Sequence, residues 1–211
     1  MVLPCIVELK RKSDVIFIMG ASSPVSAKEN FKMQKEIAKK IIRKYKISGE
    51  HTEVGVVLYG RLELEGVPFG AKASKRVLLP AIDRLRNPGD GVRIDLALNF
   101  ATDTLMYYKE DKVPQYIIAF MDQPADHSFL NKAKMVQGKG IHVTAIGIGN
   151  DVNRNELNYL SSDGIGKVVN SPLDIPSIVK EAANGKIKND SGMFRKFHAC
   201  ILSCIPCLFL Y

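Results

Sequence analysis

The sequence alternates continuous apolar runs of strand length with longer segments that have helical periodicity. The run 15–19 is apolar and rich in β-branched residues and ends at Gly20, a second apolar run occupies 116–121, and a further strand-like segment occupies 141–148. A strand that is apolar at every position is typical of a parallel sheet covered on both faces. The segment 27–46 instead repeats apolar residues every three or four positions with lysines between them, which is a helical pattern. This alternation predicts a doubly wound α/β domain.

Other segments fit the same scheme. The stretch 61–65 alternates in polarity and predicts a short antiparallel strand at one edge of the sheet. The other expected strands are 53–59 and 167–169, and the other expected helices are 77–85, a segment around 96–105, 129–137, 155–161 and 175–183. We therefore expect a mostly parallel central sheet with about six helices distributed over both faces.

The pattern divides the chain into three parts. Residues 13–184 form the predicted domain, 1–12 form an N-terminal extension, and 185–211 form a polar linker followed by an apolar tail that contains cysteines. The apolar run of the tail is 13 residues long, shorter than the ~20 that a spanning helix needs. Membrane attachment through the tail is therefore a minor alternative. The first residues do not resemble a signal peptide.

The chain is basic, with 30 Lys and Arg against 22 Asp and Glu. A net charge of +8 suits an anionic partner such as a heparin-like polysaccharide, and we expect no nucleic-acid partner. The candidate polyanion-binding residues lie on the first helix: Lys32, Lys35, Lys39 and Arg43. The alternative is that these cations form the solvated side of an amphipathic helix.

No catalytic constellation is recognisable. The glycines at 147 and 149 belong to no phosphate-binding motif, and Ser22 and Ser23 lack the surroundings of a nucleophile elbow. The four histidines have no metal-ligand spacing. These observations predict a protein that is not an enzyme.

Four stretches, taken in order, resemble the von Willebrand factor A family. They are 14–25, 95–101, 116–122 and 142–149, followed by a helix, and together they extend over about 170 residues. The resemblance implies a Rossmann-like three-layer fold and an adhesion function. The turn 85–91 is similar to that of the collagen VI-like subgroup.

The resemblance also implies a metal-ion-dependent adhesion site, which this chain matches poorly. The family's first aspartate falls on Gly20, its second serine on Pro24 and its threonine on Val92. Only Ser22 and Asp122 match directly. Asp90 comes near the threonine position if the alignment is shifted by two residues. Restoring the ligands would require Gly20→Asp, Pro24→Ser and Val92→Thr.

Mg²⁺ requires near-octahedral oxygen coordination, so we expect the site to be lost and the protein to need no metal cofactor. Ser22, Asp122 and Asp90 are then vestigial positions. The expected ligand-binding face, at the carboxyl ends of the strands, consists of Ser22, Ser23, Asp90, Arg93 and Asp122.

Several members of the family close the domain with a disulfide between its flanks, and the resemblance extends this to Cys5 and Cys200. Cys204 and Cys207 are alternative partners, and four reduced thiols are the other alternative. The resemblance implies a secreted, non-enzymatic adhesion module that binds extracellular matrix or cell-surface proteins. The alternative is an intracellular scaffold domain in a multiprotein complex.

Overall fold

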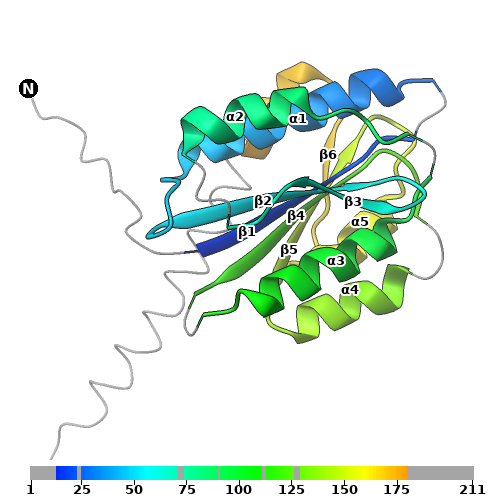
Figure 1. Ribbon diagram of the computed structural model, residues 1–211. Helices are drawn as coiled ribbons and strands as arrows, with labels where there is room; N and C mark the ends of the chain where they lie inside the picture. Colours follow the sequence, from blue (N-terminus) through cyan, green and yellow to red (C-terminus); the bar gives the residue numbers. More distant parts are fainter. Residues whose placement is uncertain are drawn as a thin grey trace, which may run out of the picture.

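The computed structural model describes residues 13–22, 25–70, 74–89, 91–110, 113–125 and 129–179. Figure 1 shows its central sheet of six strands in the order β3-β2-β1-β4-β5-β6. The strands are β1 (Ser13–Met19), β2 (Thr52–Tyr59), β3 (Glu63–Val67), β4 (Gln115–Met121), β5 (His142–Ile148) and β6 (Lys167–Val169). Within these residues every pairing is parallel except that of β2 with β3 at the edge. The predicted fold class is confirmed.

Helices cover both faces of the sheet (Figure 1). They are α1 (Ala27–Lys44), α2 (Lys75–Arg84), α3 (Ile94–Tyr107), α4 (Phe129–Gly138), α5 (Arg154–Leu160) and the 3-10 helix η1 (Pro172–Asp174), followed by a helical segment described over 175–179. One face carries α1, α2 and the segment 175–179, and the other carries α3, α4 and α5. The domain therefore has the three layers that the sequence predicts.

Strand β1 lies in the middle of the sheet and contributes to both cores. Val15, Phe17 and Met19 pack under α1 and α2, whereas Ile16 and Ile18 pack under α3. Successive side chains of a strand point to opposite faces, so a strand covered on both faces must be apolar throughout. Each such side chain stabilises the fold by roughly 1.5–3 kcal/mol relative to an exposed one.

Most element boundaries differ from the sequence prediction by one or two residues, and two of these differences have a visible cause. Helix α1 ends at Lys44 because Tyr45 adopts an extended conformation, with φ −94° and ψ 152°. Its side chain is buried in the core, and this burial raises the pKa of the Tyr45 hydroxyl. Strand β3 begins at Glu63 because the preceding residues form a turn, in which the Gly60 N–H donates to the Leu62 carbonyl at 3.1 Å.

Some predicted features lie outside the described residues. These are the N-terminal extension 1–12, the segment 185–211, the Cys5–Cys200 disulfide and the candidate site residues Ser23 and Asp90. In the part that is described, no helix is both long and apolar enough to cross a membrane.

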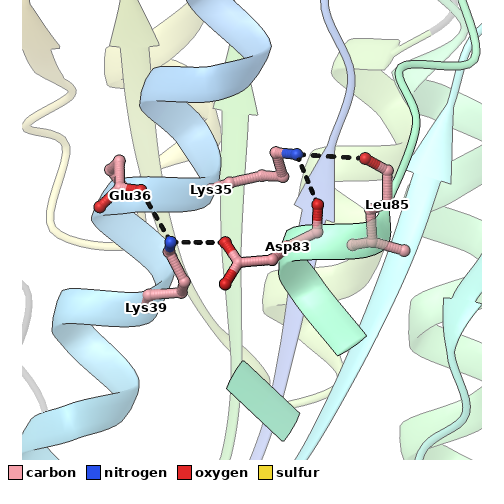
Figure 2. Close-up of polar contacts among 5 residues, drawn as sticks. All are labelled: Lys35, Glu36, Lys39, Asp83 and Leu85. Carbon is pink, nitrogen blue, oxygen red and sulfur yellow. Dashed lines mark hydrogen bonds and ion pairs between the residues drawn. The ribbon is translucent and has the colours of Figure 1, made fainter. Parts of the chain in front are cut away.

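Polar contacts fasten α1 to α2 (Figure 2). The Lys39 ammonium lies 2.7 Å from Glu36 and 2.6 Å from Asp83. The Lys35 ammonium donates to the carbonyl oxygens of Asp83 at 3.0 Å and Leu85 at 3.2 Å. Burial alone would lower the pKa of Lys39, but its hydrogen bonds to Asp83 and Glu36 raise that pKa above 10.5. Both lysines therefore have structural partners.

Replacing Lys39 by methionine is expected to lower the free energy of unfolding by about 1 kcal/mol at neutral pH. Glu36 and Asp83 are 41% and 56% exposed, so water can re-solvate their carboxylates and the loss stays near that of a surface pair. Because folding raises the pKa of Lys39, its contribution is present below pH 10.5 and is lost as the pH rises through the folded-state value.

Urea denaturation at pH 7 and at increasingly alkaline pH measures this difference, with Lys40→Met as the control. Lys40 is the adjacent lysine and is half-buried. A difference between wild type and Lys39→Met that grew above pH 10.5 would contradict the assignment.

Candidate functional site

The candidate site lies at the carboxyl ends of β1 and β4, which are neighbours in the middle of the sheet. The chain continues from β1 to β2 on one side and from β4 to β5 on the other. Open α/β sheets bind ligands at such a point, where the strand order reverses. Two segments meet here, the loop 20–22 after β1 and Asp122 directly after β4.

Two side-chain amides hold the first part of this loop. The Gly20 N–H donates to Gln34 Oε1 at 3.0 Å, and Gln34 Nε2 donates back to the Gly20 carbonyl at 2.6 Å. Asn87 binds the next residue in the same way. Its Oδ1 accepts from the Ala21 N–H at 3.2 Å, and its Nδ2 donates to the Ala21 carbonyl at 2.7 Å. Each amide thus satisfies both main-chain polar groups of one loop residue.

The Asp122 carboxylate holds the third residue of the loop. Both of its oxygens accept from the Ser22 N–H, at 3.0 and 3.1 Å. Its Oδ2 also accepts from Asn30 Nδ2 at 3.1 Å, and Asn30 Nδ2 donates to Ser26 Oγ at 3.1 Å. Asp122 is only 1% exposed, and hydrogen bonds to a charged acceptor are stronger than neutral ones. The carboxylate therefore holds the loop in place, and we call residues 20–22 the latched loop.

Tyr59, the last residue of β2, fills the space beside Gly20. A Cβ atom added to Gly20 would lie 2.3 Å from the Tyr59 carbonyl oxygen and 2.9 Å from ring atom Cδ1. The Tyr59 hydroxyl donates to the Phe120 carbonyl at 2.9 Å, so the ring is fixed at both ends. Burial, with a smaller contribution from the Asp122 charge, raises the pKa of this hydroxyl, which stays protonated as a donor.

The loop before α3 is also packed closely against the end of β2. Gly91 has φ +127°, and a Cβ atom there would lie 2.6 Å from the Arg61 nitrogen. The Arg93 N–H donates to the Gly60 carbonyl at 3.3 Å. The Arg93 guanidinium makes two hydrogen bonds to the Asp95 carboxylate, at 2.8 and 2.9 Å. Arg93 is therefore held by a residue of α3.

The residues present do not fit the magnesium site of the family. In the described part of the chain, two of the family's ligand positions have a side-chain oxygen: Ser22 with its hydroxyl and Asp122 with its carboxylate. The ligand positions Gly20 and Val92 have none. No three His, Cys, Asp or Glu side chains among the described residues form a metal-binding group. Mg²⁺ keeps several waters and is held by one or two carboxylates, and here both oxygens of the Asp122 carboxylate already accept hydrogen bonds within the protein.

The structure brings together Ser22 and Asp122, as the sequence predicts for the ligand-binding face. The Ser22 hydroxyl oxygen is buried and has no hydrogen-bond partner within the described residues. Arg93 is at the same end of the sheet but is paired with Asp95.

The sequence analysis missed the side chains that hold the loop: Gln34, Asn30 and Asn87. One signal was present, because Asn30 and Gln34 are four residues apart on the same stripe of α1 as Ile37 and Ile41, and all four are buried. A polar residue in a buried stripe requires a hydrogen-bond partner. A polar residue in the buried stripe of a helix that follows the first strand therefore indicates that side-chain hydrogen bonds hold the loop at the end of that strand.

A shallow hollow of about 290 Å³ lies on the rim of the site and is lined by Arg61, Leu62, Leu64 and Pro88. Leu62 is 67% exposed and Leu64 is 51% exposed. Pro88 directly follows Asn87, which holds the Ala21 backbone. This part of the surface therefore places accessible apolar groups beside the latched loop.

Comparison with known proteins agrees with the fold. A sequence model of the von Willebrand factor type A domain matches residues 14–175. The collagen alpha-5(VI) chain of Homo sapiens is 25% identical over 154 residues, covering 72% of this chain and 6% of that protein. Matrilin-1 of Gallus gallus is 24% identical over 157 residues, covering 73% of this chain and 31% of that protein. This chain thus spans less than a third of either relative.

Solved structures show the same architecture. The proximal thread matrix protein 1 of the mussel byssus, with a zinc-occupied MIDAS motif, superposes with a TM-score of 0.72 at 22% identity. The alignment covers 84% of this chain and 47% of the mussel protein. The manganese-loaded TRAP protein of Plasmodium vivax gives a TM-score of 0.68 at 15% identity, over 83% of this chain and 72% of that protein. The chain belongs to the von Willebrand factor type A domain family.

Proposed function

We propose that this domain is a non-enzymatic protein-binding module of an extracellular matrix or cell-surface protein, and that it binds its partner without a metal ion. Its similarity to collagen and matrilin chains supports the matrix assignment. The proposal of metal independence is supported by the Asp122 carboxylate, both of whose oxygens already accept hydrogen bonds from Ser22 and Asn30, and by Gly20 and Val92, which have no side-chain oxygen for Mg²⁺.

The proposed contact surface, which we call the rim, consists of the residues that line the hollow: Arg61, Leu62, Leu64 and Pro88. Leu62 and Leu64 expose apolar area beside Pro88, and removing apolar area from water on association is favourable by roughly 25 cal/mol per Å². The latched loop next to this rim is preorganised, so binding costs little conformational entropy.

Surface plasmon resonance against purified matrix proteins, such as collagens and matrilins, tests this proposal in buffers with Mg²⁺ and with EDTA. We expect the dissociation constant for a bound matrix protein to be the same in both buffers. Replacing Leu62 and Leu64 together by aspartate should weaken binding at least about tenfold, which is about 1.4 kcal/mol.

Leu173→Asp is the matched control, since Leu173 is 88% exposed and lies in η1 beyond the opposite edge strand. Binding that disappears in EDTA would contradict metal independence. A free Cys5 thiol in the native protein, together with no affinity for any matrix protein, would favour the intracellular scaffold instead.

A further inference from the structure

Two segments of the chain contain several cations and no acidic residue. Residues 37–49 include five Lys and Arg and no Asp or Glu, and residues 66–82 include three and none. Without these eight cations, the chain has 22 Lys and Arg against 22 Asp and Glu. The cations of these two segments thus equal the net excess of +8 in number, although other acid-free stretches such as 127–150 also contain lysines.

The fold places the two segments side by side. Helices α1 and α2 pack against each other and run in opposite directions over one face of the sheet (Figure 1). Lys75, at the start of α2, donates through its ammonium group to the carbonyl oxygen of Arg43 near the end of α1, at 2.9 Å. The last turn of α1 therefore meets the first turn of α2.

We name this surface the basic corner and define it by the cations of the two helix ends: Lys40, Arg43, Lys44, Lys75 and Arg76. Arg43, Lys44 and Arg76 are exposed, and Lys40 and Lys75 are half-buried. Helix α1 begins near the latched loop and has 18 residues, a length of about 27 Å. The basic corner thus lies at the other end of the domain from the candidate site.

The structure changes the set of candidate polyanion-binding residues. Lys35 and Lys39 are bound to α2, as Figure 2 shows. Lys32 lies in the first half of α1, away from the corner. Arg43 remains from the predicted set, and its new neighbours come from a helix that is distant in the sequence.

Stability accounts for part of the basic corner, since Lys75 has a structural partner in the Arg43 carbonyl, but not for all of it. Arg43 and Lys44 lie in the last turn of α1, where cations interact favourably with the helix dipole. Lys75 and Arg76 lie in the first turn of α2, which contains no acidic residue. Cations there oppose the helix dipole by about 0.3–1 kcal/mol each, and they also face the cations of α1. A binding role explains this arrangement.

We propose that the basic corner binds a linear sulfated polysaccharide. Such a ligand is recognised by clustered cations and needs no apolar pocket, and its binding releases counterions as phosphate-backbone binding does. Among the described residues of the two helix ends, the aromatic side chain is that of Tyr45, which is buried, and the exposed Tyr107 and Tyr108 lie at the end of α3 on the other face of the sheet. The corner cations therefore have no stacking surface of the kind that favours single-stranded nucleic acid. The choice of a polysaccharide also rests on the proposed matrix function, whereas the protein-binding rim is a separate surface.

Isothermal titration of the full chain with a heparin oligosaccharide, repeated at several salt concentrations, tests the proposal. In the variant Arg43→Gln, Lys44→Gln, Arg76→Gln, we expect affinity at 0.15 M salt to fall by at least about tenfold. The slope of log affinity against log salt should become shallower by about 2–3, because three cations no longer displace counterions.

The control variant Lys28→Gln, Lys32→Gln, Lys139→Gln removes the same charge from three exposed positions elsewhere. Its affinity should stay within about threefold of wild type, and chemically desulfated heparin should not bind measurably. Equal losses in both variants would show that only net charge matters and would overturn the proposal. So would equal affinity for polyglutamate or for a single-stranded oligonucleotide. Neither outcome depends on whether the rim binds a matrix protein.

Discussion

Gly20→Asp is expected to lower the free energy of unfolding by more than about 3 kcal/mol and to create no affinity for Mg²⁺. The new Cβ would lie 2.3 Å from the Tyr59 carbonyl oxygen, and overpacking a filled interior costs about 1–3 kcal/mol. The carboxylate would also lie close to Asp122 in a buried region, where an unpaired charge is costly. The substitution that restores the family's first ligand therefore conflicts with this fold.

Urea denaturation measures the loss of stability, and calorimetric titration with Mg²⁺ and Mn²⁺ measures metal affinity. Gly138→Asp is the control, because it introduces the same side chain where nothing lies within 4 Å of the added Cβ. It should cost less than about 1 kcal/mol, mainly through the helix dipole at the end of α4. A stable Gly20→Asp variant with stoichiometric, micromolar metal binding would contradict our account of Tyr59.

The sequence predicts the layers of this domain well because they depend on local patterns. The continuous run 15–19 fits β1, which is covered by helices on both faces, and the alternating stretch after Tyr59 predicts the antiparallel edge strand. The expectation of a lost metal site stays a prediction, which rests on the residue types at Gly20 and Val92, since neither has a side-chain oxygen.

The network around the site could not be predicted, because its hydrogen bonds join distant parts of the chain. Ser22 and Asp122 are 100 residues apart, and Ala21 and Asn87 are 66 apart. The role of Tyr59 could not be predicted for a different reason. It ends an apolar run of β2 and therefore reads as an ordinary core residue, although its ring and carbonyl occupy the space that the family's first aspartate would need.

Asp122→Ala is expected to destabilise the fold by about 2–4 kcal/mol, equally in Mg²⁺ and in EDTA. The substitution leaves the Ser22 N–H and one Asn30 N–H without their acceptor, and an unsatisfied buried donor costs about 1–3 kcal/mol. Asp122→Asn retains one acceptor oxygen, so it should cost less. Asp151→Ala, at an exposed position, should change stability by no more than about 0.5 kcal/mol.

Denaturation curves in the two buffers separate two roles for the carboxylate. If Asp122 is a latch, its removal acts on hydrogen bonds within the protein, so the loss is independent of divalent ions. Hydrogen exchange of the Ser22 amide should then become faster in Asp122→Ala, because the loop loses the acceptor that holds it. If Asp122 instead binds a metal ion, wild type should be stabilised by Mg²⁺ through linkage and the variant should not. A difference in stability between wild type and Asp122→Ala that appears only in Mg²⁺ would therefore show that Asp122 binds a metal ion.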